Sequence, residues 1–381
     1  MRRESTRSIP FTLQSHQLHK YKHPTTELGD LGLFGVTIFL NEDQNFGSEI
    51  IKNVTLACSL RVISSNMHAI GCLSRIVSRT LVTGVGRPNG ESFKTRSKEE
   101  TKLVTAVSGF PKLSNAYDID HIINGQIGDD AYFVTRHLDD WDSRKHVIGV
   151  ADGVGGWRQY GIDPGQFSSC LMKSCERLVM DGKICSDQPA KLLSQGYQKM
   201  QEFSGVKQQI IGSSTACVII LSHRDRMLYA ANIGDSGFII VRDGEVIHKS
   251  REQQHHFNTP FQLSLPPSEL ASEVLSDRPE SADKYAFSVQ NGDVIMLATD
   301  GIFDNVPEAL LAQEMATIWG CSDHRRIQQT ANSIALIARK LSQDQYFLSP
   351  FSRNARANGM DIVGGKQDDL TVLLATVILP T

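Results

Sequence analysis

The stretch Val147–Trp157, with the sequence VIGVADGVGGW, decides how this chain folds. Its short apolar run is typical of a buried strand, and it ends abruptly at an acid, Asp152. The glycines that follow allow the backbone to come close to whatever this carboxylate holds. Asp-Gly is first of all a turn dipeptide, so the stretch taken alone fits an ordinary loop equally well.

The same pattern recurs elsewhere in the chain. A second strand-like run, 293–299, ends at Asp300-Gly301, whereas the acidic pairs Asp129-Asp130 and Asp368-Asp369 stand directly before apolar runs. Two acids therefore lie at the ends of expected strands, and two acidic pairs lie at the starts of others. Because the end of an antiparallel strand lies beside the start of its neighbour, all four groups could share one sheet edge.

Gathering so many carboxylates is unfavourable, since like charges at close range raise one another's pKa values. A bound cation reverses that argument. Oxygen ligands with no matching Cys or His indicate Mg²⁺ or Mn²⁺ rather than zinc. The sequence therefore predicts a two-metal site, bridged by Asp152, that polarises a water and neutralises a phosphate ester.

Magnitudes indicate what carries such a reaction. Hydrolysis of a phosphate monoester can need roughly 10²¹-fold acceleration, whereas one general acid supplies only about 10² to 10⁴. The metal ions must therefore supply most of the effect. Losing Asp152 should be fatal, while the absence of a well-placed acid need not be.

Composition narrows the class of protein. With 381 residues, 40% hydrophobic and 21% charged, the chain can bury a sizeable core. A net charge of −3 gives no sign of the basic surface that nucleic-acid binding needs. No run approaches the roughly 18 apolar residues of a transmembrane segment. The seven cysteines show no Cys-x-x-Cys spacing, which favours a reducing compartment. None precedes Arg at the interval of cysteine phosphatases, which excludes that type of thiol nucleophile.

The chain divides into two parts. Residues 1–102 are poorly organised, and the organised domain runs over 103–381. Between residues 50 and 90 there is no Asp or Glu, while arginines alternate with apolar and hydroxyl residues. This composition, over about 67–90, is typical of a mitochondrial targeting segment, or alternatively of a solvated linker.

The organised part alternates strand and helix signals. Helical periodicity follows Pro164, Pro189 and Pro307 and runs again over 327–341. We expect hairpin turns at Asp243-Gly244 and Asn291-Gly292. Residues 250–284 and 345–366 have no period and are expected to be loops. The expected strands are 131–135, 146–151, 213–221, 227–232, 237–242, 245–248, 285–289, 293–299 and 370–379.

These elements predict an α+β fold. Many antiparallel-type strands with helices grouped in pairs favour sheet packed on sheet with helices outside. We therefore expect a four-layer α-β-β-α sandwich, in which two antiparallel sheets are flanked by helix pairs.

Six short motifs stand in a fixed order along the organised part of the chain, at 128–133, 150–156, 213–216, 232–237, 298–305 and 368–372. Their order over residues 103–378 is similar to that of metal-dependent protein phosphatases of the 2C family. Further motifs at 153–158, 252–263 and 349–351 resemble the mitochondrial-matrix branch of that family. The resemblance implies a Ser/Thr protein phosphatase in which a metal-activated water attacks directly, without a phosphoenzyme.

The resemblance also implies roles at the metal centre. Asp152 would bridge two Mn²⁺ or Mg²⁺ ions, and the carbonyl of Gly153 would bind the first of them. Asp300 and Asp368 would bind the second. These three aspartates would form the catalytic group.

Further acids would support that centre. Asp129 and Asp130 would hold waters on the ions, with Asp369 behind them. Asp235 matches a position that takes a third, weaker ion together with Asp300, although a turn explains Asp235 equally well. Asp304 is expected to cap the following helix.

Two departures from the family pattern affect the site. Val154 stands where many relatives have a His proposed as general acid, and Asn124–Ile127 lacks the phosphate-binding Arg found just before the first acidic pair. Arg136 and Arg158 are candidate substitutes, although an exposed Arg is usually just solvated.

The sequence leaves other activities open. A catalytically weak phosphoprotein-binding module on the same fold is the main alternative, and the intact metal acids argue against it. A two-metal nuclease would need a basic surface that this chain lacks. We expect a monomer without a transmembrane segment that acts on phosphoproteins, in the mitochondrial matrix or otherwise in the cytoplasm.

Overall fold

A computed structural model describes residues 101–112, 122–135, 145–185, 187–204 and 210–380. These residues belong to one compact unit, Arg87–Thr381. Residues 1–100, including the expected targeting segment, lie outside the described residues. No helix in the described ranges is long and apolar enough to cross a membrane.

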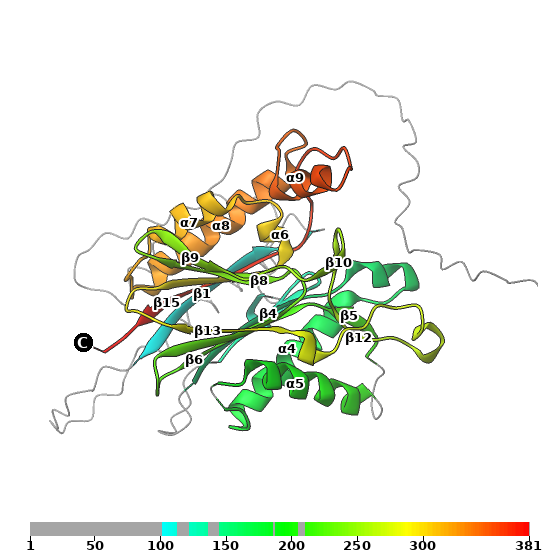
Figure 1. Cartoon of the computed structure of the whole chain (residues 1–381), viewed down its shortest axis with the longest axis horizontal. Coiled ribbons are helices and arrows are strands. Elements are labelled where there is room, and N and C mark those ends of the chain that lie inside the picture. The colour runs from blue at the N-terminus through cyan, green and yellow to red at the C-terminus, as the bar shows by residue number, and fades with distance from the viewer. Residues whose placement is uncertain (1–100, 113–121, 136–144, 186, 205–209, 381) are drawn as a thin grey trace, which may run out of the picture. The chain divides into compact units, whose positions relative to one another are not determined.

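Two antiparallel sheets form the centre of this unit (Figure 1). The first sheet has the order β1 (Lys102–Phe110), β15 (Leu370–Ile378), β14 (Val294–Ala298), β8 (Gly237–Arg242) and β9 (Glu245–Lys249). The second has the order β13 (Asp283–Ser288), β7 (Met227–Ile233), β6 (Ala216–Ser222), β4 (Lys145–Asp152), β3 (Asp130–Val134) and β2 (Gln126–Ile127).

Shorter elements complete the unit. Two small pairs of strands are β5 (Gly212–Ser214) with β12 (Leu263–Leu265), and β10 (Gln254–His256) with β11 (Thr259–Pro260). The helices are α4 (Pro164–Met180), α5 (Pro189–Ser204), α6 (Asp300–Phe303), α7 (Glu308–Ala316), α8 (His324–Gln343) and α9 (Pro350–Ala357), and the 3₁₀ turns are η1 (Gly155–Tyr160), η2 (Ser268–Leu270) and η3 (Pro279–Ser281).

Alternation along the strands produces the layers. In β14, Ile295 and Leu297 point into the core between the sheets, whereas Met296 and Ala298 pack under α7 and α8. The second sheet buries its outer face against α4 and α5 in the same way. The expected four-layer sandwich is confirmed, with one helix pair on each outer face (Figure 1).

Local chemistry explains where α4 begins and ends. The side chain of Asp163 accepts a hydrogen bond from the backbone N–H of Gly165 at 3.1 Å, and Pro164 occupies the first turn, where its missing N–H costs nothing. After the last turn, Gly182 takes a positive φ of 69°. The buried stripe includes Phe167, Leu171, Cys175 and Leu178, as the periodicity predicts.

One of the two expected hairpins is wrong. Asp243 and Gly244 both have positive φ and join β8 to β9, as predicted. Asn291-Gly292, by contrast, does not join paired strands, because β13 pairs with β7 while β14 pairs with β8 and β15. This turn carries the chain from one sheet to the other.

The two expected loops also contain regular structure. Residues 345–366 include α9, whose first turn is capped by the hydroxyl of Ser349 on the N–H of Ser352 at 3.1 Å. Residues 250–284 include the short strands β10 to β12. The strands in the first segment have only two or three residues each and α9 has eight, which is too short for a period to be visible in the sequence.

Candidate metal centre

Strand register brings the four acidic motifs to one end of the sandwich. Asp130, at the start of β3, lies directly opposite Asp152, at the end of β4. In the other sheet, Ala298 lies opposite Val372, so Asp300 and the pair at 368–369 flank that strand pair. The motifs therefore share one end of two facing sheets rather than one edge of a single sheet.

A hydrogen bond joins the two sheets at this end. The hydroxyl of Thr299, the residue before Asp300, donates to Oδ2 of Asp130 at 2.8 Å, and both side chains are buried. The sequence analysis did not single out Thr299. Its contact aligns the acids of β3 with those that follow β14.

Asp152 is held by the strand beside it. Its backbone N–H donates to the hydroxyl of Thr215 at 3.1 Å, and the N–H of Thr215 donates back to its carbonyl at 2.9 Å. The next residue, Gly153, donates its N–H to the carbonyl of Asp129 at 3.1 Å. A Cβ at Gly153 would lie 2.5 Å from the carbonyl oxygen of Pro164, so only glycine fits here.

Asp369 holds two backbone segments together next to the site. Its carboxylate accepts the backbone N–H groups of Asp129 at 2.9 Å and Lys112 at 2.5 Å. A Cβ at Gly128 would lie 2.0 Å from this carboxylate, and one at Gly301 would lie 2.0 Å from the Asp369 carbonyl. Glycine at both positions is required for the close approach of the two sheets.

A lysine missed in the sequence analysis lies inside the cluster. The ammonium of Lys366 forms ion pairs with Oδ2 of Asp300, with Oδ2 of Asp304 at 2.7 Å and with Oδ2 of Asp368 at 3.3 Å. The available signal was its place two residues before an acidic pair, directly after Gly364-Gly365.

The position of Asp304 corrects an expectation. The residue before the first turn of α7 is Pro307, and no side chain caps that helix. Asp304 instead ends α6 and turns its carboxylate to Lys366. The ion pair with a buried ammonium is stronger than the capping bond that the sequence suggested.

Electrostatics differ within the cluster. Burial raises the pKa of Asp152 well above its usual value, and the charges of Asp300 and Asp130 raise it further. Burial also raises the pKa of Asp130, Asp235 and Asp368. Asp300 is the exception: burial raises its pKa, but the ammonium of Lys366 and hydrogen bonds from Asp152 and Gly301 together hold the pKa below the usual value.

Several carboxylate oxygens in the cluster lack a partner. Within the described residues, Oδ1 of Asp130, Asp235 and Asp300 is buried and accepts no hydrogen bond. A buried oxygen of this kind is costly unless a ligand satisfies it. Hard divalent cations bind such oxygens, so the residues fit Mg²⁺ or Mn²⁺.

The same cluster is open rather than closed around one point. Among the residues that the structure describes, no three Asp, Glu, His or Cys side chains converge as the complete ligand set of an ion. Mg²⁺ commonly keeps several waters and uses only one or two carboxylates. The backbone carbonyl of Gly153 and the scattered aspartates are compatible with that kind of binding.

Of the two candidate arginines, one lies at the site. Arg158, in η1, forms an ion pair with Oδ1 of Asp129, and its side chain is half exposed. Burial and the charge of Asp369 raise the pKa of Asp129 to about 6, although Arg158 opposes the shift. Arg136 lies outside the described residues.

The segment that follows Asp152, which includes η1, is held in place by a buried hydrogen-bond chain. The indole N–H of Trp157 donates to the hydroxyl of Ser213 at 2.7 Å, and this hydroxyl in turn donates to Gln262 at 2.5 Å. Trp157 is buried, so η1 is fixed, while the side chain of Arg158 reaches Asp129 and stays half exposed. Val154 is the residue before η1 and has no side-chain donor.

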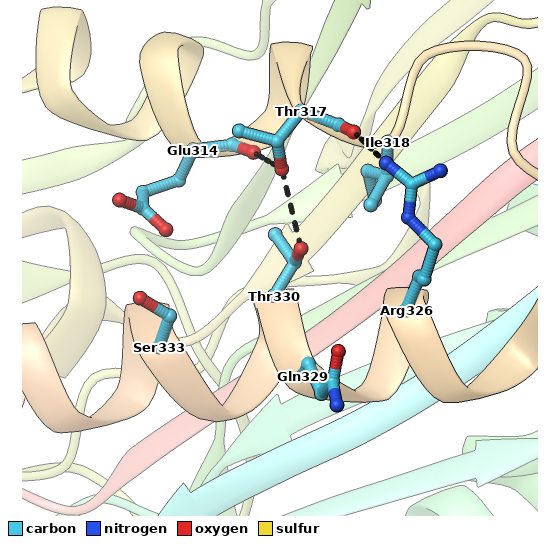
Figure 2. A pocket seen from close by; sticks show the side chains of 7 residues that line it. All are labelled: Glu314, Thr317, Ile318, Arg326, Gln329, Thr330 and Ser333. Atoms are coloured by element: carbon cyan, nitrogen blue, oxygen red, sulfur yellow. Dashed lines mark hydrogen bonds between the residues drawn. The ribbon is translucent and has the colours of Figure 1, made fainter. Parts of the chain in front are cut away.

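A separate cavity of about 250 Å³ lies between α7 and α8 (Figure 2). Its lining contains none of the acids described above. Its polar groups pair with one another, since Arg326 donates to the carbonyl of Thr317 at 3.0 Å and the hydroxyls of Thr317 and Thr330 are 3.3 Å apart. The cavity is therefore not the candidate metal centre.

Two facing sheets between helix pairs, with partly unsatisfied carboxylates at one end, define the class of metal-dependent phosphohydrolases. The comparisons with known proteins agree. A sequence profile described as Protein phosphatase 2C matches residues 119–334.

The chain therefore belongs to the protein phosphatase 2C family. It is 44% identical to a protein phosphatase PTC7 homolog of Danio rerio over 82% of this chain and 98% of that one. It is 50% identical to the PTC7 homolog of Homo sapiens, over 66% and 79% of the two chains. The photosystem II phosphatase PBCP is similar in structure, with a TM-score of 0.57 and 28% identity over 72% of this chain and 98% of that one.

Membership of this family gives the activity. The chain is a metal-dependent serine/threonine protein phosphatase, as the resemblance of its motifs implied. Enzymes of this family use Mn²⁺ or Mg²⁺ and act on phosphoproteins.

Proposed function

We propose that the phosphatase works through a dinuclear Mn²⁺ or Mg²⁺ centre at the acidic end of the two sheets. Asp152 would bridge the ions, the Gly153 carbonyl would bind the first, and Asp300 and Asp368 would bind the second. Bound there, the ions supply an activated water and neutralise charge on the phosphate. The observation that carries this proposal is the set of buried, unpartnered carboxylate oxygens at the joined strand ends.

The other acids have supporting roles in this proposal. Asp130, opposite Asp152, would hold water molecules that are bound to the ions. Asp129, the residue before it, would do the same. Asp369 would hold both in register through its bond to the Asp129 N–H. Asp235 lies close enough to Asp300 for their charges to interact, at the position where the resemblance implies a third, weaker ion.

Arg158 is our candidate for the phosphate-binding residue. Its guanidinium lies beside Asp129 and is half exposed, so it can reach a ligand at the mouth of the site while its base is fixed by η1. A planar guanidinium binds two phosphate oxygens at once. Arg136 stays a second candidate from the sequence alone.

The leaving alcohol needs a proton that Val154 cannot give. Because one general acid contributes only about 10² to 10⁴, a solvent-derived proton is an adequate substitute when the ions carry the main effect. We therefore assign no side chain as general acid.

We further propose that the enzyme acts in the mitochondrial matrix as a monomer. Its relatives are PTC7 homologs, which form the mitochondrial branch of the family. The acid-poor, arginine-containing composition around 67–90 supports import. A fluorescent fusion of residues 67–90 beside a full-length fusion tests this, and cytosolic signal from both would end the matrix assignment.

The test of the mechanism is hydrolysis of p-nitrophenyl phosphate by the full chain with Mn²⁺, Mg²⁺ or chelator, beside Asp152→Asn and Asp300→Asn. We expect metal-dependent turnover that both substitutions abolish. No turnover from folded, metal-replete protein would favour a weak phosphoprotein-binding module instead. Binding of a phosphopeptide without release of phosphate would then identify that module.

A further inference from the structure

The acidic cluster already contains one cation that belongs to the chain. The side chain of Lys366 is 16% exposed, and its ammonium contacts Asp300, Asp304 and Asp368. A single positive charge therefore lies among three carboxylates that come from two separate segments of the chain. Desolvating an ammonium is costly, so only close contact with several acids stabilises it there.

The backbone of Lys366 is fixed independently of its charge. The amide of buried Asn305 donates to the Lys366 carbonyl at 2.8 Å, and the Lys366 N–H donates to the same side chain at 2.9 Å. A Cβ at the preceding Gly365 would lie 2.1 Å from the carbonyl of Leu341, so the chain is pressed against the end of α8. The lysine is therefore aimed into the cluster by its surroundings.

An aromatic ring also contributes to this placement. The ring of Phe351, near the start of α9, lies 5.4 Å from the ammonium. A cation over a ring face gains attraction that increases when both are desolvated. The ring of Phe257, in the turn between β10 and β11, packs against that of Phe351, with 5.3 Å between the ring centroids.

Lys366 contacts Asp300, which the resemblance pairs with Asp235 at a third, weaker ion. Asp235 is buried, its Oδ1 has no partner among the described residues, and both Asp300 and Lys366 act on it electrostatically. Asp304 adds a carboxylate on the same side, and Lys366 bonds to it. Asp152 and Gly153 approach the cluster from the other sheet.

We propose that the ammonium of Lys366 takes the place of a third metal ion beside Asp235, Asp300 and Asp304. The enzyme then holds two ions and supplies the third positive charge itself. This inference rests on the proposed dinuclear centre. It makes the charge on that side permanent and independent of the metal concentration.

The experiment counts Mn²⁺ bound to the full chain by equilibrium dialysis with elemental analysis, with wild type beside Lys366→Met. Methionine has similar length and no charge, so it opens the place between the three acids. We expect about two ions in the wild type and about three in Lys366→Met. The double variant Lys366→Met, Asp235→Asn should return to about two.

Two variants serve as controls for charge and for fold. Lys366→Arg keeps the charge and should hold about two ions. Lys112→Met removes another ion pair with Asp368, at 3.4 Å, but Lys112 is half exposed, and this variant should also hold about two. Circular dichroism with Mn²⁺ present identifies the folded samples, and a Lys366→Met chain that folds only with Mn²⁺ and carries about three ions supports the proposal.

Other counts would overturn it. Three ions in the wild type, or two in folded Lys366→Met, would show that Lys366 replaces no metal while leaving the dinuclear centre intact. A count near zero in every protein would instead remove the dinuclear centre, and this inference with it.

Discussion

The two ends of strand β14 hold the same residue type in opposite circumstances. At one end Asp293 is buried, and Arg242 binds both of its oxygens, with N–O distances of 2.8 and 2.7 Å. At the other end Asp300 faces further carboxylates and has one oxygen without a partner in the described structure. Seven residues apart, one acid has both oxygens bound by a single arginine, whereas Lys366 contacts one oxygen of the other and leaves the second without a partner.

The difference teaches how to separate structural from functional charge. A buried acid with a dedicated cation and complete hydrogen bonding explains itself by stability. A buried group of acids with too few cations costs free energy in the folded chain, so it indicates a ligand. The following predictions test that separation from the largest expected effect to the smallest.

Removing an acid at the metal end should abolish activity. Asp300→Asn keeps the shape of the side chain but loses the charge that binds a cation, and we expect turnover to fall by at least about 10³-fold. Steady-state kinetics with p-nitrophenyl phosphate at saturating Mn²⁺ measures this. A variant that keeps more than a tenth of wild-type turnover would contradict the role of Asp300.

Removing the cation at the other end should affect stability alone. Arg242→Met leaves Asp293 buried without its partner, which should cost about 3 to 5 kcal/mol in the free energy of unfolding. Urea denaturation measures it. Lys183→Met, which breaks an exposed pair with Asp181, is the control and should cost less than about 1 kcal/mol. Turnover per folded molecule should not change in either variant.

The pH dependence of stability should reverse with metal. Folding raises the pKa of Asp129 to about 6 and that of Asp304 to about 7, mainly through burial, so the folded chain binds more protons than the unfolded one between about pH 4 and 7.

With chelator present, stability should therefore fall as the pH rises through this window, by on the order of 5 kcal/mol. With excess Mn²⁺ it should rise instead, because ions bind the deprotonated acids. Thermal unfolding at pH 5 and pH 7 distinguishes the two. The same slope with and without Mn²⁺ would contradict metal binding at these acids.

Arg158 should affect substrate binding more than chemistry. Arg158→Gln removes the guanidinium at the mouth of the site, and we expect KM for a phosphopeptide to rise about 10-fold with a smaller change in kcat. Arg158→Lys should recover only part of the affinity, since an ammonium cannot bind two oxygens in a plane. An unchanged KM would leave Arg158 as a partner of Asp129 only.

The smallest effect belongs to the cap of α4. Asp163→Ala removes the acceptor for the Gly165 N–H and should cost about 1 kcal/mol in unfolding free energy, while Asp163→Ser should retain most of it. Denaturant titration measures both. Equal loss in the two variants would show that the cap contributes through something other than this hydrogen bond.

Much of the fold could be predicted because its signals are local. The pattern that predicts a strand such as β8 lies in neighbouring residues of the sequence. The same holds for a helix such as α4, with its Pro and Gly signals. The sequence could not show that the turn at Asn291-Gly292 carries the chain from one sheet to the other. A turn dipeptide carries no information about which sheets its flanking strands join. β1 was missed as well, since its polar residues blur the alternation.

The candidate site divides in the same way. The acids could be located because each one directly ends or begins an apolar run. Lys366 and Thr299 could not, because their importance comes from contacts with Asp300, Asp304 and Asp130, which are brought near only by the packing of the two sheets. Local patterns reveal strand ends, but they do not reveal what lies opposite across a layer.

The register of Asp130 opposite Asp152 has a consequence for insertions and deletions. Deleting one residue inside β4 would turn Asp152, the last residue of that strand, to the other face of the sheet, since side chains alternate. Residues added beyond Gly153, or in the turn that precedes β2, would leave the pair in place. The length of β4 is therefore fixed to the residue, whereas the length of these loops is not.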